Sequence, residues 1–166
     1  MGKHTSSYQL RMAEELRQNP DLLRSRQGVL VILIVWLAFR TVFTGFDALN
    51  VLLHRGAPSS CVLNLVSLLI CFAFAYCMYR GGKWFALMPL FGGLLTLYQV
   101  LAGQLLPLSL AYGDPLLVIG AVFTLLCGAL QFILMLLLLV LPSLRPYLHA
   151  ASRIHKATSG RAKREL

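Results

Sequence analysis

The chain has 166 residues, of which 58% are hydrophobic and 13% are charged, and its mean hydropathy is +0.73. A soluble domain of this length has too little interior to hide so much apolar surface, so the composition excludes an ordinary soluble fold and indicates a membrane protein. The formal net charge is +9. Because the basic residues flank hydrophobic runs, we expect anionic lipid headgroups as their partners and no nucleic acid.

Four hydrophobic runs of membrane-spanning length follow a polar N-terminal segment, residues 1–27. The predicted spans are 28–47, 60–79, 84–106 and 115–141, each close to the ~20 residues that cross a hydrocarbon core. The first run follows a long polar segment and has no small-residue cleavage motif behind it, so we interpret it as a retained span. The predicted fold class is an all-α, polytopic membrane four-helix bundle over residues 28–141, with short loops and a basic tail at 142–166.

Helix-capping residues and prolines agree with these boundaries. Polar residues with an adjacent proline are typical of helix starts, a proline after an apolar run is typical of a helix end, and paired glycines are typical of tight turns. The predicted starts are at Asn19-Pro20, Ser59-Ser60 and Asp114-Pro115, the predicted ends at Pro107 and Pro142, and the predicted turn at Gly81-Gly82.

The distribution of Lys and Arg predicts the orientation. All but two of the 15 basic residues, Arg40 and Arg55, lie in segments 1–27, 80–83 and 142–166. With four spans, this bias places both termini in the cytoplasm, and the chain is expected in the plasma (cytoplasmic) membrane. Aromatic residues near the inner boundary suit an interfacial belt. They are Tyr76, Tyr79 and Trp84.

Both tails are predicted to lie along the inner membrane surface. Residues 8–16 have a helical pattern, and residues 143–157 interleave apolar and basic side chains, as an interfacial helix on anionic lipid does. A basic docking surface for a soluble partner is a second interpretation of the C-terminal tail, whose end is expected to be flexible.

Small and polar residues recur at helical spacing within the spans, on one face of each helix. Such residues let membrane helices approach closely and form hydrogen bonds between helices, so we expect these faces to pack against one another. In the third and fourth spans the packing residues are Gly92, Gly103, Gly120, Thr124, Cys127 and Gly128, with Gln131 continuing the pattern.

Arg40 is the residue that packing alone explains least. It lies 12 residues after Gly28, about 18 Å along a helix, where a charge costs roughly 2.5–3.5 kcal/mol unless it faces protein or water. Asp47 shares its face two turns away, which suggests a bridging ligand, water or helix between them. The alternatives are an internal ion pair and a polar recess, open to the outside, that binds an anionic group. The candidate binding residues are Arg40, Thr44, Asp47, Asn64, Ser67, Thr96 and Gln99.

No pattern in the chain indicates catalysis, a cofactor or a metal site. His54 is the histidine nearest a carboxylate, and the sequence has no C-x-x-C pair, phosphate-binding loop or G-x-S-x-G turn. The expected function is therefore that of a non-enzymatic subunit or interaction component, with a membrane protein or a second copy as partner. The alternative is a small transporter, channel or lipid-handling protein that uses the recess around Arg40.

Overall fold

The computed structural model describes residues 7–53, 58–102 and 115–162, which are helical and contain no strand. Four of the helices are long and apolar enough to cross a membrane, over Pro20–Leu49, Cys61–Tyr79, Lys83–Leu101 and Val118–Val140. The predicted all-α class and its four apolar spans are confirmed. The elements are α1 (Ser7–Gln18), α2 (Pro20–Leu52), α3 (Pro58–Tyr79), η1 (Lys83–Ala86), α4 (Leu87–Leu101), α6 (Pro115–Val140), η2 (Pro142–Leu144) and α7 (Arg145–Ala162).

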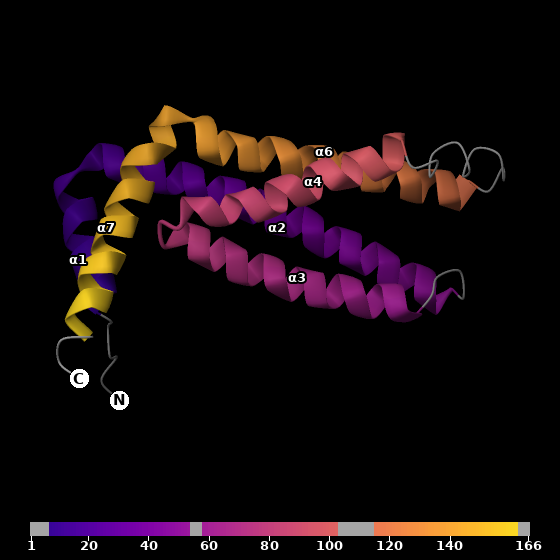
Figure 1. Ribbon diagram of the computed structural model, residues 1–166, viewed down its shortest axis with the longest axis horizontal. Coiled ribbons are helices and arrows are strands. Elements are labelled where there is room, and N and C mark those ends of the chain that lie inside the picture. Colours follow the sequence, from indigo (N-terminus) through magenta and orange to yellow (C-terminus); the bar gives the residue numbers. More distant parts are fainter. Residues whose placement is uncertain (1–6, 54–57, 103–114, 163–166) are drawn as a thin grey trace.

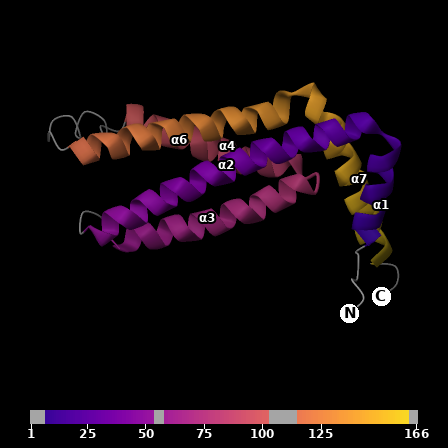
Figure 2. The same cartoon turned by 180° about the vertical axis from the view of Figure 1, so that it is seen from behind.

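The long helices run alongside one another, whereas α1 and α7 lie side by side across one end of them (Figure 1). The turn between α3 and η1 is at this same end, which we call the terminal end. The opposite end, where α2 meets α3 along the chain, is the loop end. Figure 2 shows the same arrangement from behind.

The predicted helix start at Asn19-Pro20 is confirmed, because the Asn19 side chain accepts a hydrogen bond of 3.2 Å from the Asp21 backbone N–H and Pro20 is the first helical residue. The helix therefore begins well before the predicted span at 28–47. It is about 50 Å long at the usual helical rise, so its first turns belong to the layer that α1 and α7 form at the terminal end. Helix α3 begins at Pro58, just before the predicted Ser59-Ser60, and α6 ends before Pro142 as expected.

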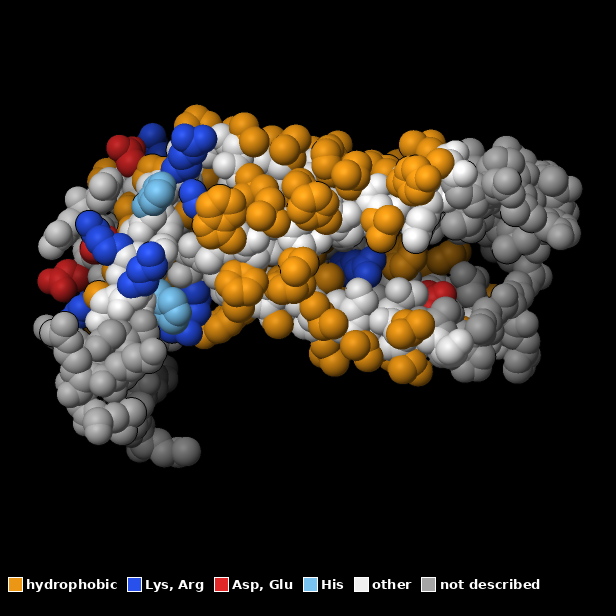
Figure 3. Space-filling model, viewed as in Figure 1, with side chains coloured by type: hydrophobic (Ala, Val, Ile, Leu, Met, Phe, Trp, Pro, Cys, Tyr) orange, Lys and Arg blue, Asp and Glu red, His pale blue; other side chains and the backbone are white. Residues whose placement is uncertain are grey.

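Most of the tightly packed large side chains in the described residues are in the terminal half of the molecule, and Val100, near the loop end of α4, is the exception. The large side chains with almost no exposed surface come from α2, α3, α4, α6 and α7. Elsewhere the long helices expose mainly apolar side chains, which suits contact with lipid acyl chains (Figure 3). The most buried large residues are Val29, Trp36, Met78, Val100, Met135, Leu138 and Tyr147.

The C-terminal tail forms the predicted helix, but its apolar face is buried against protein. Leu144, Leu148 and Ile154 are each 4% exposed, because α1, α2 and α3 pack around α7. An exposed ion pair of 2.7 Å, from Arg153 Nη2 to Glu15 Oε1, links α7 to α1. These apolar side chains are therefore unavailable for the lipid contact expected of an interfacial helix.

Helices α4 and α6 touch through glycines. A Cβ atom added at Gly93 would lie 2.9 Å from the backbone nitrogen of Phe132 and 3.0 Å from the carbonyl oxygen of Gly128. A Cβ at Gly128 would lie 3.0 Å from Thr96 Cγ2. The two backbones are therefore in direct contact, which is the role expected of small residues between membrane helices.

The four long helices form two pairs. Helix α3 packs mainly on α2, and α4 mainly on α6, while α2 and α6 join the pairs. In Figure 1, α3 and α4 are close near η1 and separate toward the loop end. The space-filling view shows a hollow between α3 and the α4–α6 pair, in which basic and acidic side chains are visible (Figure 3).

Candidate functional site

Arg40 is half-buried on α2 and is held by α3. Its Nη2 donates a hydrogen bond of 2.6 Å to Ser67 Oγ, the Cys71 thiol lies beside the guanidinium, and its Cζ is 5.6 Å from the centroid of the Phe43 ring. Its Nε is buried and has no hydrogen-bond partner among the described residues. The guanidinium therefore retains capacity to bind an acceptor in an apolar setting, where an unsatisfied donor is costly.

The second charged side chain of this region, Asp47, is also in contact with α3. Asn64 Nδ2 donates a hydrogen bond of 3.1 Å to Asp47 Oδ2. The two bonds, Arg40 to Ser67 and Asn64 to Asp47, connect α2 and α3 at successive levels, as expected for neighbouring antiparallel helices. We call the group formed by Arg40, Asp47, Asn64, Ser67 and Cys71 the Arg40 recess.

The other candidate binding residues lie elsewhere or use their hydroxyls locally. Thr44 is buried and donates a hydrogen bond of 3.0 Å to the Arg40 carbonyl, and Thr96 donates one of 2.9 Å to the Gly92 carbonyl. Gln99 is exposed on α4. The structure thus brings together four of the seven predicted residues, Arg40, Asp47, Asn64 and Ser67.

The predicted packing residues are divided between two contacts. Gly92 and Gly128 lie between α4 and α6, whereas a Cβ at Gly120 would lie 3.7 Å from Phe46 on α2. The hydroxyl of Thr124 donates a hydrogen bond to the Gly120 carbonyl within α6. Cys127 is near enough to Arg40 to interact electrostatically with the guanidinium. Gly103, like His54 and Asp114, lies outside the described residues.

Gln131 connects three of the long helices. Its Nε2 donates a hydrogen bond of 2.6 Å to the Pro89 carbonyl on α4, and its Oε1 accepts one of 3.2 Å from Trp36 Nε1 on α2. Trp36, only 2% exposed, therefore has its indole donor satisfied.

We expect Gln131→Leu to lower the free energy of unfolding by about 1–2 kcal/mol, because it leaves the Trp36 donor buried without a partner and removes a bond between helices. The measurement is reversible unfolding in mixed detergent micelles. Gln99→Leu makes the same chemical change at an exposed position of α4 and should leave the free energy of unfolding unchanged. Equal destabilisation by the two variants would contradict the bridging role of Gln131.

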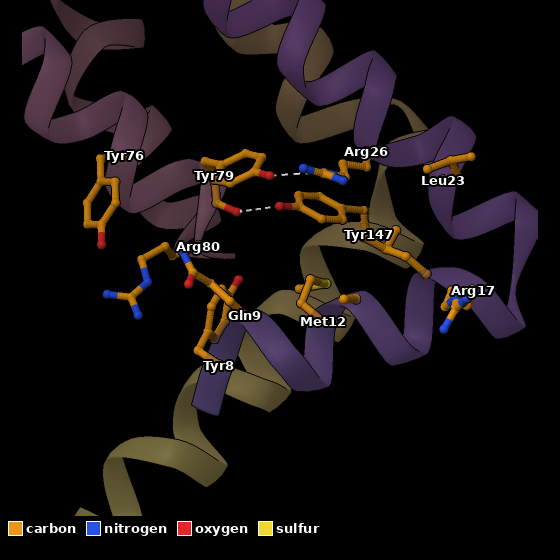
Figure 4. Close-up of a pocket in the computed structure, with 12 residues that line it drawn as sticks. Tyr8, Gln9, Met12, Arg17, Leu23, Arg26, Tyr76, Tyr79, Arg80 and Tyr147 are labelled. Carbon is orange, nitrogen blue, oxygen red and sulfur yellow. Dashed lines mark hydrogen bonds between the residues drawn. The ribbon is translucent and has the colours of Figure 1, made fainter. Parts of the chain in front are cut away.

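A separate pocket of about 660 Å³ lies at the terminal end, between α1, the start of α2, the end of α3 and α7 (Figure 4). Its polar residues are mostly tyrosines and arginines, and its apolar ones include Met12, Leu16 and Leu23. The sequence patterns did not predict it, because Tyr76 and Tyr79 are equally typical of an interfacial belt. We call the following residues the aromatic–basic pocket: Tyr8, Arg26, Tyr76, Tyr79, Arg80 and Tyr147.

Within the described residues, no group of three or more His, Cys, Asp or Glu side chains is placed to hold a metal ion. The fold and its surface are those of an all-helical, multi-pass membrane protein. No protein-family model, curated protein sequence or solved structure matches the chain.

Proposed function

We propose that the protein is a non-enzymatic component of a membrane assembly and that the Arg40 recess receives a carboxylate or other acceptor from a transmembrane helix of another subunit. The observation that carries this proposal is the half-buried Arg40 guanidinium in an apolar helix, which Ser67 anchors at Nη2 while its Nε has no hydrogen-bond partner among the described residues. A charge at this depth needs a polar partner, because acyl chains offer no acceptor.

The geometry of the hollow favours a helix as the partner. The hollow lies on the side of the molecule, between α3 and the α4–α6 pair, so its occupant approaches within the plane of the membrane (Figure 3). A transmembrane helix presents a side-chain acceptor there and satisfies its own backbone donors internally.

The charge distribution supports a location in the plasma membrane with both termini in the cytoplasm. Basic side chains gather at the terminal end (Figure 3), and the turn that carries Arg80 and Lys83 is at this end too. By the positive-inside rule this end faces the cytoplasm. The Arg40 recess then lies toward the outer side of the bilayer.

The test is crosslinking in the native membrane, followed by affinity purification in mild detergent and mass spectrometry of the intact assembly. We expect a stoichiometric membrane protein with the wild type, and at least about a tenfold loss of it with Arg40→Gln, which removes a charge-assisted hydrogen bond. Thr41→Val is the matched control, because Thr41 is the next residue, is exposed and donates to the Leu37 carbonyl of its own helix. A partner retained equally by Arg40→Gln would contradict the proposal.

A second candidate function rests on the same guanidinium. In a small transporter, channel or lipid-handling protein, Arg40 binds an anionic group directly. This function is favoured if the purified protein contains no partner subunit but contains a small anionic molecule that Arg40→Gln loses and Thr41→Val keeps.

A further inference from the structure

Three arginines line the pocket, Arg17, Arg26 and Arg80, and contacts with tyrosines hold the last two in place. Arg26 Nε donates a hydrogen bond of 2.9 Å to the Tyr79 hydroxyl, and Arg80 Cζ lies 4.8 Å from the centroid of the Tyr8 ring and 5.3 Å from that of Tyr76. Arg80 Cζ lies over both rings, and the N–H groups of a guanidinium point outward in its plane, where they bind oxyanions. None of the described residues that line this pocket carries a carboxylate.

The pocket also contains a buried hydroxyl that lacks a partner. Tyr8 is 8% exposed, and its hydroxyl has no hydrogen-bond partner among the described residues. Burial raises the pKa of Tyr8, so the hydroxyl stays protonated and is able to donate. Tyr147 already donates, with a bond of 2.9 Å to the Tyr79 carbonyl, which fixes its ring against the pocket (Figure 4).

The remaining wall of the pocket is mainly apolar, and its polar members are Gln9 and Arg17 of α1. Met12 and Leu16 of α1 and Leu23 of α2 line it beside the tyrosines. Tyr76, one of the lining residues, is 59% exposed on α3, near the end of the Cys61–Tyr79 span. The pocket is therefore at the level where the headgroups of one leaflet meet the acyl chains, and its volume of about 660 Å³ suits a headgroup with the first part of its chains.

We infer that the aromatic–basic pocket binds the phosphate headgroup of an anionic membrane lipid from the leaflet at the terminal end. The phosphate lies against the N–H edge of Arg80 and accepts the Tyr8 hydroxyl, and Arg26, across Tyr79 in the same pocket, adds positive charge, while the glycerol and upper acyl carbons contact Met12 and Leu23 (Figure 4). Free phosphate shares the first set of contacts but not the second. This site is separate from the Arg40 recess and does not depend on the function proposed for it.

The binding test uses the full-length protein in a nonionic detergent and dihexanoyl phosphatidic acid as the probe, with dissociation constants from native mass spectrometry. The double variant Arg26→Gln/Arg80→Gln should bind the probe at least about tenfold more weakly, because it removes charge-assisted bonding to phosphate and a nearby positive charge. The matched control is Arg24→Gln/Arg145→Gln, which removes two exposed charges from the same end outside the pocket. It should change binding by less than about twofold. An equal loss with both double variants would overturn the pocket and leave only surface charge attraction.

Two further experiments distinguish a lipid from free phosphate and test the role of Tyr8. Inorganic phosphate at the same concentration should neither bind nor compete; competition equal to that of the lipid would overturn the lipid assignment. Tyr8→Phe removes one hydroxyl, so it should leave the lipid-free protein at least as stable and bind the probe several-fold more weakly. Unchanged binding by Tyr8→Phe together with unchanged binding by the arginine double variant would overturn the site. Arg40→Gln should bind the probe like the wild type, which distinguishes this result from any failure at the recess.

Discussion

Gly81→Ala is expected to detach α7 from the ends of the long helices and to lower the free energy of unfolding by about 2–4 kcal/mol. Gly81 has φ +91°, a left-handed conformation that disfavours any residue with a Cβ. A Cβ there would also meet the backbone of α7, at the Ser152 nitrogen and 2.8 Å from the Leu148 carbonyl oxygen. Neither backbone atom can rotate away as a flexible side chain can.

Hydrogen exchange is the measurement that tests this variant, since it reports on α7 separately from the spans. Amides of α7 should exchange faster in Gly81→Ala, while those of α4 and α6 should stay protected. Gly45→Ala is the control, because nothing lies within 4 Å of a Cβ at that position. Asparagine tolerates the left-handed backbone better than alanine does, but Gly81→Asn also adds the Cβ that meets α7. Equally fast exchange of α7 amides in Gly81→Asn and Gly81→Ala would therefore assign the effect to the contact with α7. Full protection of α7 in Gly81→Ala would contradict the close contact between Gly81 and α7.

Gly93→Leu is expected to separate α4 from α6 and to lower the free energy of unfolding by about 3 kcal/mol or more. A single Cβ at Gly93 would already be 2.9 Å from the Phe132 backbone nitrogen, and a leucine adds three further carbons in the same direction. The helices must then move apart, which also weakens the bond of 2.6 Å from Gln131 to the Pro89 carbonyl.

Unfolding in mixed detergent micelles gives the size of this effect, and Gly45→Leu is its control. Gly45 lies on α2 in open space, so the same substitution adds an apolar side chain that faces lipid and should be close to neutral. Gly93→Leu and Gly45→Leu with equal stability would show that the α4–α6 contact is not as close as the glycines indicate.

The features of the fold that follow from local patterns were predictable from the sequence. Span length, the Asn19-Pro20 start and the Gly81-Gly82 turn depend on residues close together in the chain. The α4–α6 contact was also visible as small residues at helical spacing, although Gly93, the most tightly enclosed of them, was not among those predicted. Periodicity identifies a face, but it does not say which of two adjacent glycines lies nearest the neighbouring helix.

The layer of α1 and α7 was not predictable in the same way. An amphipathic helix has the same pattern whether its apolar face meets lipid or protein, and the burial of Leu148 and Ile154 against protein depends on a second helix from the other end of the chain. The aromatic–basic pocket depends on the same distant contact, since Tyr8 and Tyr147 meet Tyr79 only when both terminal helices are in place.

The polar candidate residues around Arg40 differ in whether their side chains form hydrogen bonds to another helix or to the backbone of their own helix. Ser67 and Asn64 reach across to α2. The hydroxyls of Thr44 and Thr96 instead bond to the carbonyl four residues earlier, an arrangement open to any threonine in a helix. Spacing alone does not distinguish these two outcomes.

The separation of α3 from α4 toward the loop end (Figure 1) opens only one side of the molecule, because α2 and α6 stay in contact there through Phe43 and Phe46 against Phe123. At the terminal end, Gly81 lies against α7 and the pairs are held together again. The two helix pairs are therefore joined toward both ends, and the hollow beside α3 has a wall of packed helices behind it.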